Sequence, residues 1–209
     1  MHKEYDDNLR KKYGLKLVGI DECGRGAWCG PLVAAAVCLP EDFVLDGLTD
    51  SKKLSENKRK EYYELIKQNA LAYSIQEITP SEIDKNGLSW ANIQAMERAG
   101  LNVAEKVDKV SVYVIDQSPC KSLNPYIMMP KADSTSMSVA AASVLAKVYR
   151  DELMYAFSDQ YPDYCYGQNK GYIDQAHVNA VNKFGIIKGF YRESYNVKGY
   201  NKPTQLKLI

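Results

Sequence analysis

The chain has 209 residues, 45% of them hydrophobic, and a formal net charge of +1 at pH 7. This length and composition predict one large domain, or one domain with a small appendage. The near-zero charge excludes nucleic-acid binding through an overall basic field. Any contact with nucleic acid must therefore come from local clusters of lysine and arginine.

Cysteine and histidine usage narrows the possible metal chemistry. Five cysteines without a CxxC pair argue against a disulfide framework or a zinc site and favour a reducing compartment. His2 and His177 are the only histidines of the sequence, so any metal must be held by oxygen atoms. The polar start and the lack of an apolar run of about 18 residues predict a cytoplasmic protein without a membrane segment, and we expect a monomer.

Apolar runs predict three strands in the first half of the chain. They lie at residues 15–20, 32–39 and 72–79. Between the second and the third, Ser55 can cap a helix that runs to about Asn69.

The second half is predicted to alternate between helices and one clear strand. Ser89 can cap a helix with apolar residues on one side, and the run at 110–115 is the clearest strand of the sequence. A long helix is expected at 138–157, where an alanine run would let it lie close to a sheet. A last helix, capped by Asp174, is expected to run to Phe184.

This irregular alternation of strands and helices favours an α/β fold with a mixed sheet. We expect residues 1–199 to form a single domain and residues 200–209 to form a flexible tail.

Two adjacent carboxylates, Asp21 and Glu22, stand where the first predicted strand ends, and a Gly-Arg-Gly turn at 24–26 follows. At an effective dielectric of about 20, two unit charges about 4 Å apart repel by about 4 kcal/mol. A fold that keeps such a pair beside a strand usually supplies a cation. The glycines leave backbone N–H groups open to a partner that approaches closely.

Two further carboxylates stand out by position. Asp116 follows the clearest strand, and Asp133 precedes the alanine-rich helix. Carboxylates at strand ends of open α/β sheets tend to line the ligand crevice. Acids without histidine suit Mg²⁺ or Mn²⁺, and two such ions can activate a water and stabilise the leaving oxygen in phosphodiester cleavage. Spacing alone leaves the alternative that Asp116 is a turn residue and Asp133 a helix cap.

Six blocks of this sequence, in this order, resemble the type II ribonuclease H (ribonuclease HII) family, over roughly residues 15–195. The blocks are Asp21-Glu-Cys-Gly-Arg-Gly26, Gly30-Pro-Leu-Val-Ala-Ala-Ala36, Asp50-Ser-Lys-Lys-Leu-Ser55, Asn92-Ile-Gln-Ala-Met96, Asp133 with Ser138-Val-Ala-Ala-Ala-Ser-Val-Leu-Ala-Lys147 and Arg150-Asp151, and Gly171-Tyr172 with His177. Gln117 departs from the family pattern, because glycine is frequent at that position.

The resemblance implies a ribonuclease-H-like mixed β-sheet flanked by helices, with a C-terminal helical extension. It also implies endonucleolytic cleavage of RNA in RNA–DNA hybrids and at single ribonucleotides in duplex DNA, as in ribonucleotide excision repair. The cut would fall 5′ to the ribonucleotide and leave a 3′-hydroxyl and a 5′-phosphate. The catalytic, metal-binding acids would be Asp21, Glu22, Asp116 and Asp133.

The resemblance further implies which residues contact the substrate. Gly24, Arg25 and Gly26 would test for the 2′-hydroxyl through their backbone, and Tyr172 would pack on the sugar of the following nucleotide. Lys52, Lys53 and Lys147 are candidate phosphate contacts. We interpret His177 as a structural helix residue and assign it no proton transfer.

The end of the chain carries a separate signal. Gln205-Leu-Lys-Leu-Ile209 resembles the short peptide by which bacterial replication proteins dock on the sliding clamp. The alternatives are a tail that folds back on its own domain and a fortuitous match.

Two other functions compete with the metal-dependent nuclease. One is a non-catalytic nucleic-acid-binding or clamp-associated module, which the presence of all the acids argues against. The other is a DNA nuclease or strand-transferase with the same sheet, which the Gly-Arg-Gly and Gly-Tyr blocks argue against.

Overall fold

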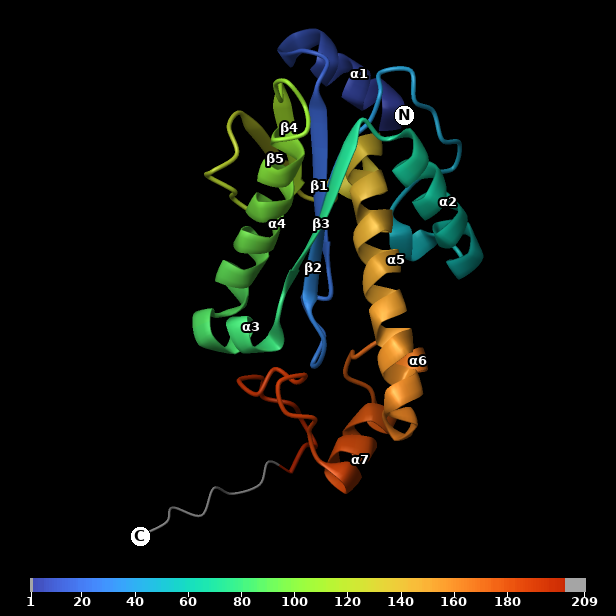
Figure 1. Cartoon of the computed structure of the whole chain (residues 1–209), viewed down its shortest axis with the longest axis vertical. Helices are drawn as coiled ribbons and strands as arrows, with labels where there is room; N and C mark the ends of the chain where they lie inside the picture. Colours follow the sequence, from blue (N-terminus) through green and yellow to red (C-terminus); the bar gives the residue numbers. More distant parts are fainter. Residues whose placement is uncertain (1, 202–209) are drawn as a thin grey trace.

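A central strand organises the sheet in the computed structural model, which describes residues 2–201 (Figure 1). This strand, β1 (Leu17–Cys23), pairs antiparallel with β2 (Leu32–Cys38) and parallel with β4 (Val112–Asp116). β3 (Ala72–Ile78) extends the β2 side antiparallel, and β5 (Tyr126–Met129) extends the β4 side in parallel. The strand order is therefore β3-β2-β1-β4-β5.

Helices cover both faces of the sheet (Figure 1), so β2 is apolar and buried along its whole length, as is β1 from Leu17 to Ile20. One face packs against α4 (Leu88–Ala104), which follows the short α3 (Pro80–Asn86). The other face packs against α5 (Met137–Gln160) and α2 (Glu56–Asn69). The N-terminal helix α1 (His2–Tyr13) packs beside α5.

Alternation along β1 sends its side chains to the two faces in turn. Val18 and Ile20 join the cluster formed with α4, whereas Leu17 packs with Val139 of α5. Gly19 lies directly under α5, where an added Cβ would come within 2.2 Å of the backbone carbon of Ser138. The absence of a side chain at Gly19 therefore allows α5 to approach the sheet, in addition to the alanine run predicted for that role.

The C-terminal part lies beyond one end of the sheet (Figure 1). It forms its own apolar cluster, which includes Trp28. It contains α6 (Tyr166–Asn169), α7 (Gln175–Phe184) and the turn η3 (Pro162–Tyr164). Trp28 follows the Gly-Arg-Gly turn, and its backbone N–H donates to the Gly171 carbonyl at 2.8 Å. This helical part is thus tied to the segment that leaves β1.

Several predicted boundaries agree with the structure. Ser55 accepts a hydrogen bond from the N–H of Lys58 and caps α2, and Asp174 accepts from His177 and caps α7. Gly185 follows the end of α7 at Phe184, as expected.

Other expectations were wrong. Ser89 does not cap α4, because the turn at Gly87 (φ 86°) ends α3 and begins α4 one residue before Ser89. The long helix begins at Met137, with Ser136 as its cap. Helices α1 and α3 and strand β5 were not predicted, since α1 is polar and the other two elements are short.

The expected single domain at 1–199 and flexible tail at 200–209 stay predictions. Residues 202–209, including the candidate peptide Gln205–Ile209, lie outside the described residues. Among residues 2–201, none of the helices combines the length and apolar character that a membrane crossing requires.

The close approach of α5 to β1 predicts a strong effect of Gly19→Ala. The new methyl group would overlap the α5 backbone, so we expect a loss of about 3 kcal/mol or more in the free energy of unfolding. Urea denaturation measures this loss. Gly26→Ala is the matched control, because no atom lies within 4 Å of its added Cβ, and an equal effect of both substitutions would contradict the packing argument.

Candidate active site

The site begins where two parallel strands separate. Ile20 of β1 and Ile115 of β4 form the last pair between these strands, and Asp21 and Asp116 are the next residues of each. β1 itself continues, because Asp21, Glu22 and Cys23 remain paired with β2. Asp21 and Glu22 therefore lie within β1, and Asp116 is the last residue of β4, where it pairs with Met129. This corrects the expectation that these acids follow the ends of their strands, and the alternative that Asp116 is a turn residue.

Asp133 reaches the same place from a short turn between β5 and α5. This turn, η2 (Ala132–Ser134), lies beside Asp116, whose Oδ1 accepts a hydrogen bond from the Ala132 N–H at 3.4 Å. Ser136 caps α5, so the alternative of Asp133 as the helix cap is excluded. Gln117 has a φ of 51°, which explains why glycine is frequent at this position in the family that the sequence resembles.

Burial and crowding disfavour the charged forms of Asp21 and Glu22. Burial raises the pKa of Asp21 well above its ordinary value, and Glu22, Asp116 and Asp133 raise it further. Burial likewise raises the pKa of Glu22, with a further rise from Asp116 and an opposing effect of Arg25. The backbone therefore holds these carboxylates together despite their mutual repulsion.

Asp50 is a further carboxylate of this site that the sequence interpretation missed. It caps the turn η1 (Ser51–Lys53), and its Oδ1 accepts from the Lys52 N–H at 2.9 Å. The pKa of Asp133 is raised by burial and then by the charges of Asp50 and Asp116. Burial also raises the pKa of Asp116, to which Asp50 adds. The sequence signal that could have identified Asp50 is its position as the first residue of the Asp-Ser-Lys-Lys block.

Two cavities that share Lys52 are lined by Glu22, Asp116 and Asp133, whereas the buried Asp21 lines neither. A cavity of about 490 Å³ brings together Glu22 and most of the predicted substrate residues, namely Gly24, Arg25, Gly26, Lys52, Lys147 and Tyr172. A cavity of about 320 Å³ is lined by Asp50, Lys52, Lys53, Asp116 and Asp133, among others. The structure thus gathers residues from distant parts of the chain at one end of the sheet.

A buried guanidinium fixes the Gly-Arg-Gly turn. Arg192 is fully buried and donates to the carbonyls of Gly24 at 2.7 Å, Arg25 at 2.8 Å and Gly30 at 3.2 Å. Within residues 2–201, the N–H groups of Arg25 and Gly26 have no hydrogen-bond acceptor. They are therefore available to a ligand. Sequence interpretation left Arg192 unassigned, because a lone arginine near the end of a chain carries no signal of this role.

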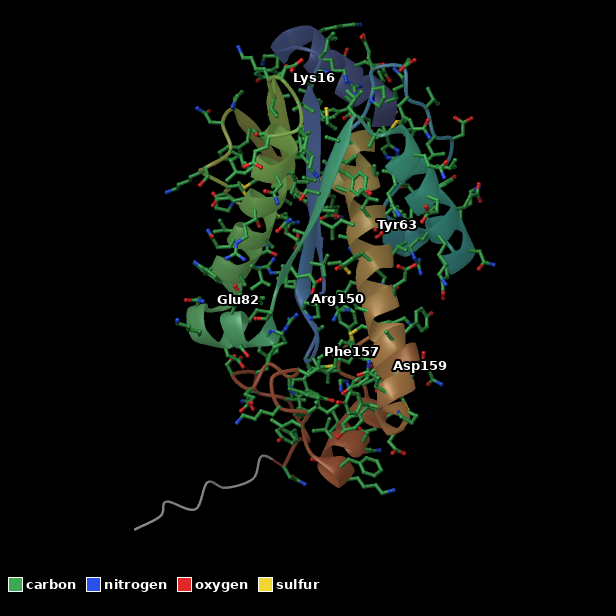
Figure 2. All side chains as sticks on the ribbon, viewed as in Figure 1. Lys16, Tyr63, Glu82, Arg150, Phe157 and Asp159 are labelled. Carbon is green, nitrogen blue, oxygen red and sulfur yellow. The ribbon has the colours of Figure 1, made fainter. Side chains whose placement is uncertain are left out.

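A second guanidinium lies behind the same turn. Arg150, on the side of α5 that faces the sheet (Figure 2), donates to the carbonyls of Pro31 at 3.0 Å and Cys29 at 3.1 Å. Gly24 has a φ of 88°, and a Cβ there would lie 2.1 Å from Arg150 Nε. Only glycine satisfies both constraints at this position.

Tyr172 lies over positive charge at the edge of the larger cavity. Its ring centroid is 5.2 Å from the Arg150 guanidinium carbon and 6.0 Å from Lys147 Nζ. The Tyr172 carbonyl lies 2.9 Å from Nδ1 of His177, which is fully buried. Burial lowers the pKa of His177, so the ring is neutral at pH 7 and supports the Tyr172 backbone, in line with its structural interpretation.

The three predicted phosphate contacts differ in their surroundings. Lys52 has a side chain that is 79% exposed, with Nζ 3.9 Å from Asp50. Lys147 Nζ forms an ion pair with Asp151 at 2.8 Å. Lys53 Nζ lies 3.5 Å from Ser134 Oγ, next to Asp133.

The donor set fits a hard divalent cation. Among the described residues, no group of three or more histidine, cysteine, aspartate or glutamate side chains is already arranged to hold an ion. The acids nevertheless offer only oxygen donors, and the pKa of each of the four is raised by another carboxylate, so a cation would relieve a repulsion that the fold maintains.

Comparisons with known proteins identify relatives over nearly the whole described chain. The model of the family described as Ribonuclease HII matches residues 18–198. Ribonuclease HII of Francisella tularensis subsp. novicida (strain U112) is 40% identical over 192 residues, which are 92% of this chain and 99% of the relative.

Two solved structures share the fold. The PCNA:RNase HII complex from Archaeoglobus fulgidus matches with a TM-score of 0.70 and 25% identity, over 88% of this chain and 96% of that one. Bst-RNase HIII, solved in complex with Mn²⁺, matches with a TM-score of 0.69 and 19% identity, over 87% of this chain and 67% of that one. The predicted α/β, ribonuclease-H-like mixed sheet is confirmed.

The crowding of the acids predicts that Asp21→Asn stabilises the metal-free protein. With a chelator at pH 7.5, we expect a higher Tm, by about 2–4 °C for each kcal/mol of repulsion relieved. The raised pKa of Asp21 means that the charged form destabilises the fold. The difference must therefore shrink as the pH falls through this raised pKa and the wild-type carboxyl becomes neutral.

Thermal unfolding across pH measures this effect. Asp159→Asn is the control, because Asp159 is an exposed carboxylate in the last turn of α5 (Figure 2). An unchanged or lower Tm for Asp21→Asn in chelator would contradict the electrostatic account.

Proposed function

The chain belongs to the ribonuclease HII family, and we propose that it cleaves RNA in RNA–DNA hybrids and at single ribonucleotides embedded in duplex DNA. As a metal-dependent ribonuclease H-type endonuclease, it would cut 5′ to the ribonucleotide and leave a 3′-hydroxyl and a 5′-phosphate. The observation that carries the proposal is the convergence of carboxylates from three chain segments beside the Gly-Arg-Gly turn and Tyr172.

Asp21, Glu22, Asp116 and Asp133 are the proposed catalytic and metal-binding residues, for Mn²⁺ or Mg²⁺. Two such ions, when bound, would activate the attacking water and stabilise the leaving 3′-oxygen. The chain's own contribution is to hold four carboxylates at the separation of β1 and β4. All of these residues come from one chain, so the proposal requires only a monomer.

Recognition of the ribonucleotide rests on the backbone of the Gly-Arg-Gly turn. The 2′-hydroxyl can both donate and accept a hydrogen bond, and it is the group that distinguishes RNA from DNA. The N–H groups of Arg25 and Gly26 can donate to it, with Gly24 allowing close approach and Arg192 fixing the turn from behind. A fixed turn distinguishes RNA from DNA better than a mobile one, because its N–H groups cannot move to meet a sugar whose 2′-position lies elsewhere.

Tyr172 is proposed to pack on the sugar of the nucleotide that follows. It lines the same cavity as the Gly-Arg-Gly turn and is held in place through its backbone by His177. The proposed phosphate contacts are Lys52, Lys53 and Lys147, which position the backbone without reading sequence. Removal of ribonucleotides from DNA in a reducing cytoplasm would suit five cysteines that are all free.

A matched pair of duplexes tests the proposal. One is all DNA, and the other carries a single ribonucleotide; we expect a cut 5′ to the ribonucleotide only in the second, with Mn²⁺ or Mg²⁺ present. Asp21→Asn should lower the cleavage rate by more than about a hundredfold, since loss of a ligand exceeds the usual effect of an outer-shell change. Cleavage of both duplexes alike would favour a DNA nuclease instead.

Duplex binding provides the control for Asp21→Asn. The variant should bind the ribonucleotide-containing duplex in chelator as the wild type does, because the recognition turn is unchanged. Substantial cleavage by a folded Asp21→Asn protein would reject the role given to this carboxylate.

We also propose that Gln205–Ile209 binds a sliding clamp. The Archaeoglobus fulgidus relative was solved in a complex with PCNA, and this pentapeptide carries apolar anchors that can fill a hydrophobic groove. The peptide follows the last described residue, Asn201, by only a few positions.

Pull-down with a purified clamp tests this contact. The full chain should retain the clamp, whereas a chain ending at Thr204 and the double variant Leu206→Ala, Leu208→Ala should not. Lys207→Ala lies between the anchors and should behave as the wild type. Equal retention by the full and shortened chains would reject the clamp contact.

A further inference from the structure

The N-terminal helix α1 precedes the residues that match the family and contacts the segment that follows Asp133. Its residue Asp6 is only 1% exposed, which is unusual for a carboxylate. Burial of an unpaired carboxylate is strongly unfavourable, so the hydrogen-bond partners of Asp6 indicate its role.

All hydrogen-bond partners of the Asp6 carboxylate lie at the start of α5. Oδ1 accepts from the Ser136 hydroxyl at 2.6 Å. Oδ2 accepts from the backbone N–H and the hydroxyl of Ser138, at 2.9 and 2.8 Å. Ser136 also caps α5 by accepting from the Val139 N–H at 3.3 Å. Asp6 therefore fixes the first turn of α5, the helix that begins a few residues after Asp133.

Two more contacts join α1 to the strands and turns that carry the acids. Nε2 of His2 lies 2.7 Å from the Ser134 carbonyl, one residue after Asp133. The Tyr5 hydroxyl donates to Met129 Sδ at 3.2 Å, and Met129 is the β5 residue paired with Asp116. The helix thus contacts the segments on both sides of η2.

We propose that Asp6 is a positioning residue for Asp133, which makes α1 a working part of the metal-binding site. A negative charge at the N-terminus of the long helix α5 is favourable, and the two serines orient it. The backbone from Ser134 to Ser138 is then held at both ends, so the Asp133 carboxylate is presented at a fixed place beside Asp116. This inference rests on the proposed function, in which Asp133 holds a divalent ion.

Mn²⁺ titration of the full chain tests the proposal through two readouts. One is the rise in Tm with Mn²⁺ alone, and the other is the Mn²⁺ concentration for half-maximal cleavage of the ribonucleotide-containing duplex. For Asp6→Ala we expect the midpoints of both titrations to shift to about tenfold higher Mn²⁺ concentration, as for the loss of a residue that hydrogen-bonds near a metal ligand. The KM for the duplex should be unchanged.

Two controls separate positioning from general stability. Asp7→Ala removes the neighbouring carboxylate of α1, whose partners Lys3 and Arg10 are both on α1, and should leave the Mn²⁺ curves unchanged. Ile66→Ala removes a fully buried side chain of α2, opens a cavity between α2 and the sheet, and lowers Tm without touching the site. Asp6→Asn keeps the shape of the side chain, and it should show the same direction of change if Asp6→Ala fails to fold.

Coincident Mn²⁺ curves for the wild type, the Asp6 variants and Ile66→Ala would overturn the positioning role, whatever the change in Tm. Failure of the wild type to cleave would instead reject the proposed function. In that case the Mn²⁺-dependent rise in Tm still decides the role of Asp6.

Discussion

The structure depends on one electrostatic constraint, the confinement of several carboxylates at the point where β1 and β4 separate. Asp21 and Asp116 are adjacent across this separation, and the turn with Asp133 lies against Asp116. Burial and repulsion both disfavour their charged forms, so the fold must hold them in place by other means. The sheet does this through the continued pairing of β1 with β2.

Rigid support from behind is the common feature of the rest of the site. Arg192 and Arg150 bind carbonyl oxygens of the turn and its neighbours, so the opposite side of the Gly-Arg-Gly peptide groups remains open to a ligand. His177 supports Tyr172, and Asp6 supports the start of α5. Each of these polar groups is buried, shares at least one hydrogen bond with backbone and lines neither cavity. In the proposed function, specificity for a ribonucleotide would follow from these fixed backbone positions, with few side chains needed for it.

The sequence predicted the central strands and marked the acids and the glycine turn as candidates, because apolar runs and charged neighbours are local patterns. It failed where position depends on the tertiary structure. Ser89 has the residue type of a cap, but the Gly87 turn decides where α4 begins. Asp50 and Arg192 look like ordinary surface charges until folding brings them to the site. Asp6 lies in a polar helix whose role depends on serines about 130 positions away.

The central claim is tested most directly by anomalous diffraction. The crystals contain the wild-type chain, Mn²⁺ and a ribonucleotide-containing duplex. The account predicts manganese peaks among the oxygens of Asp21, Glu22, Asp116 and Asp133, with the 2′-hydroxyl against the turn at 24–26. Manganese bound elsewhere, or carboxylates that remain apart in the presence of saturating metal and duplex, would contradict it.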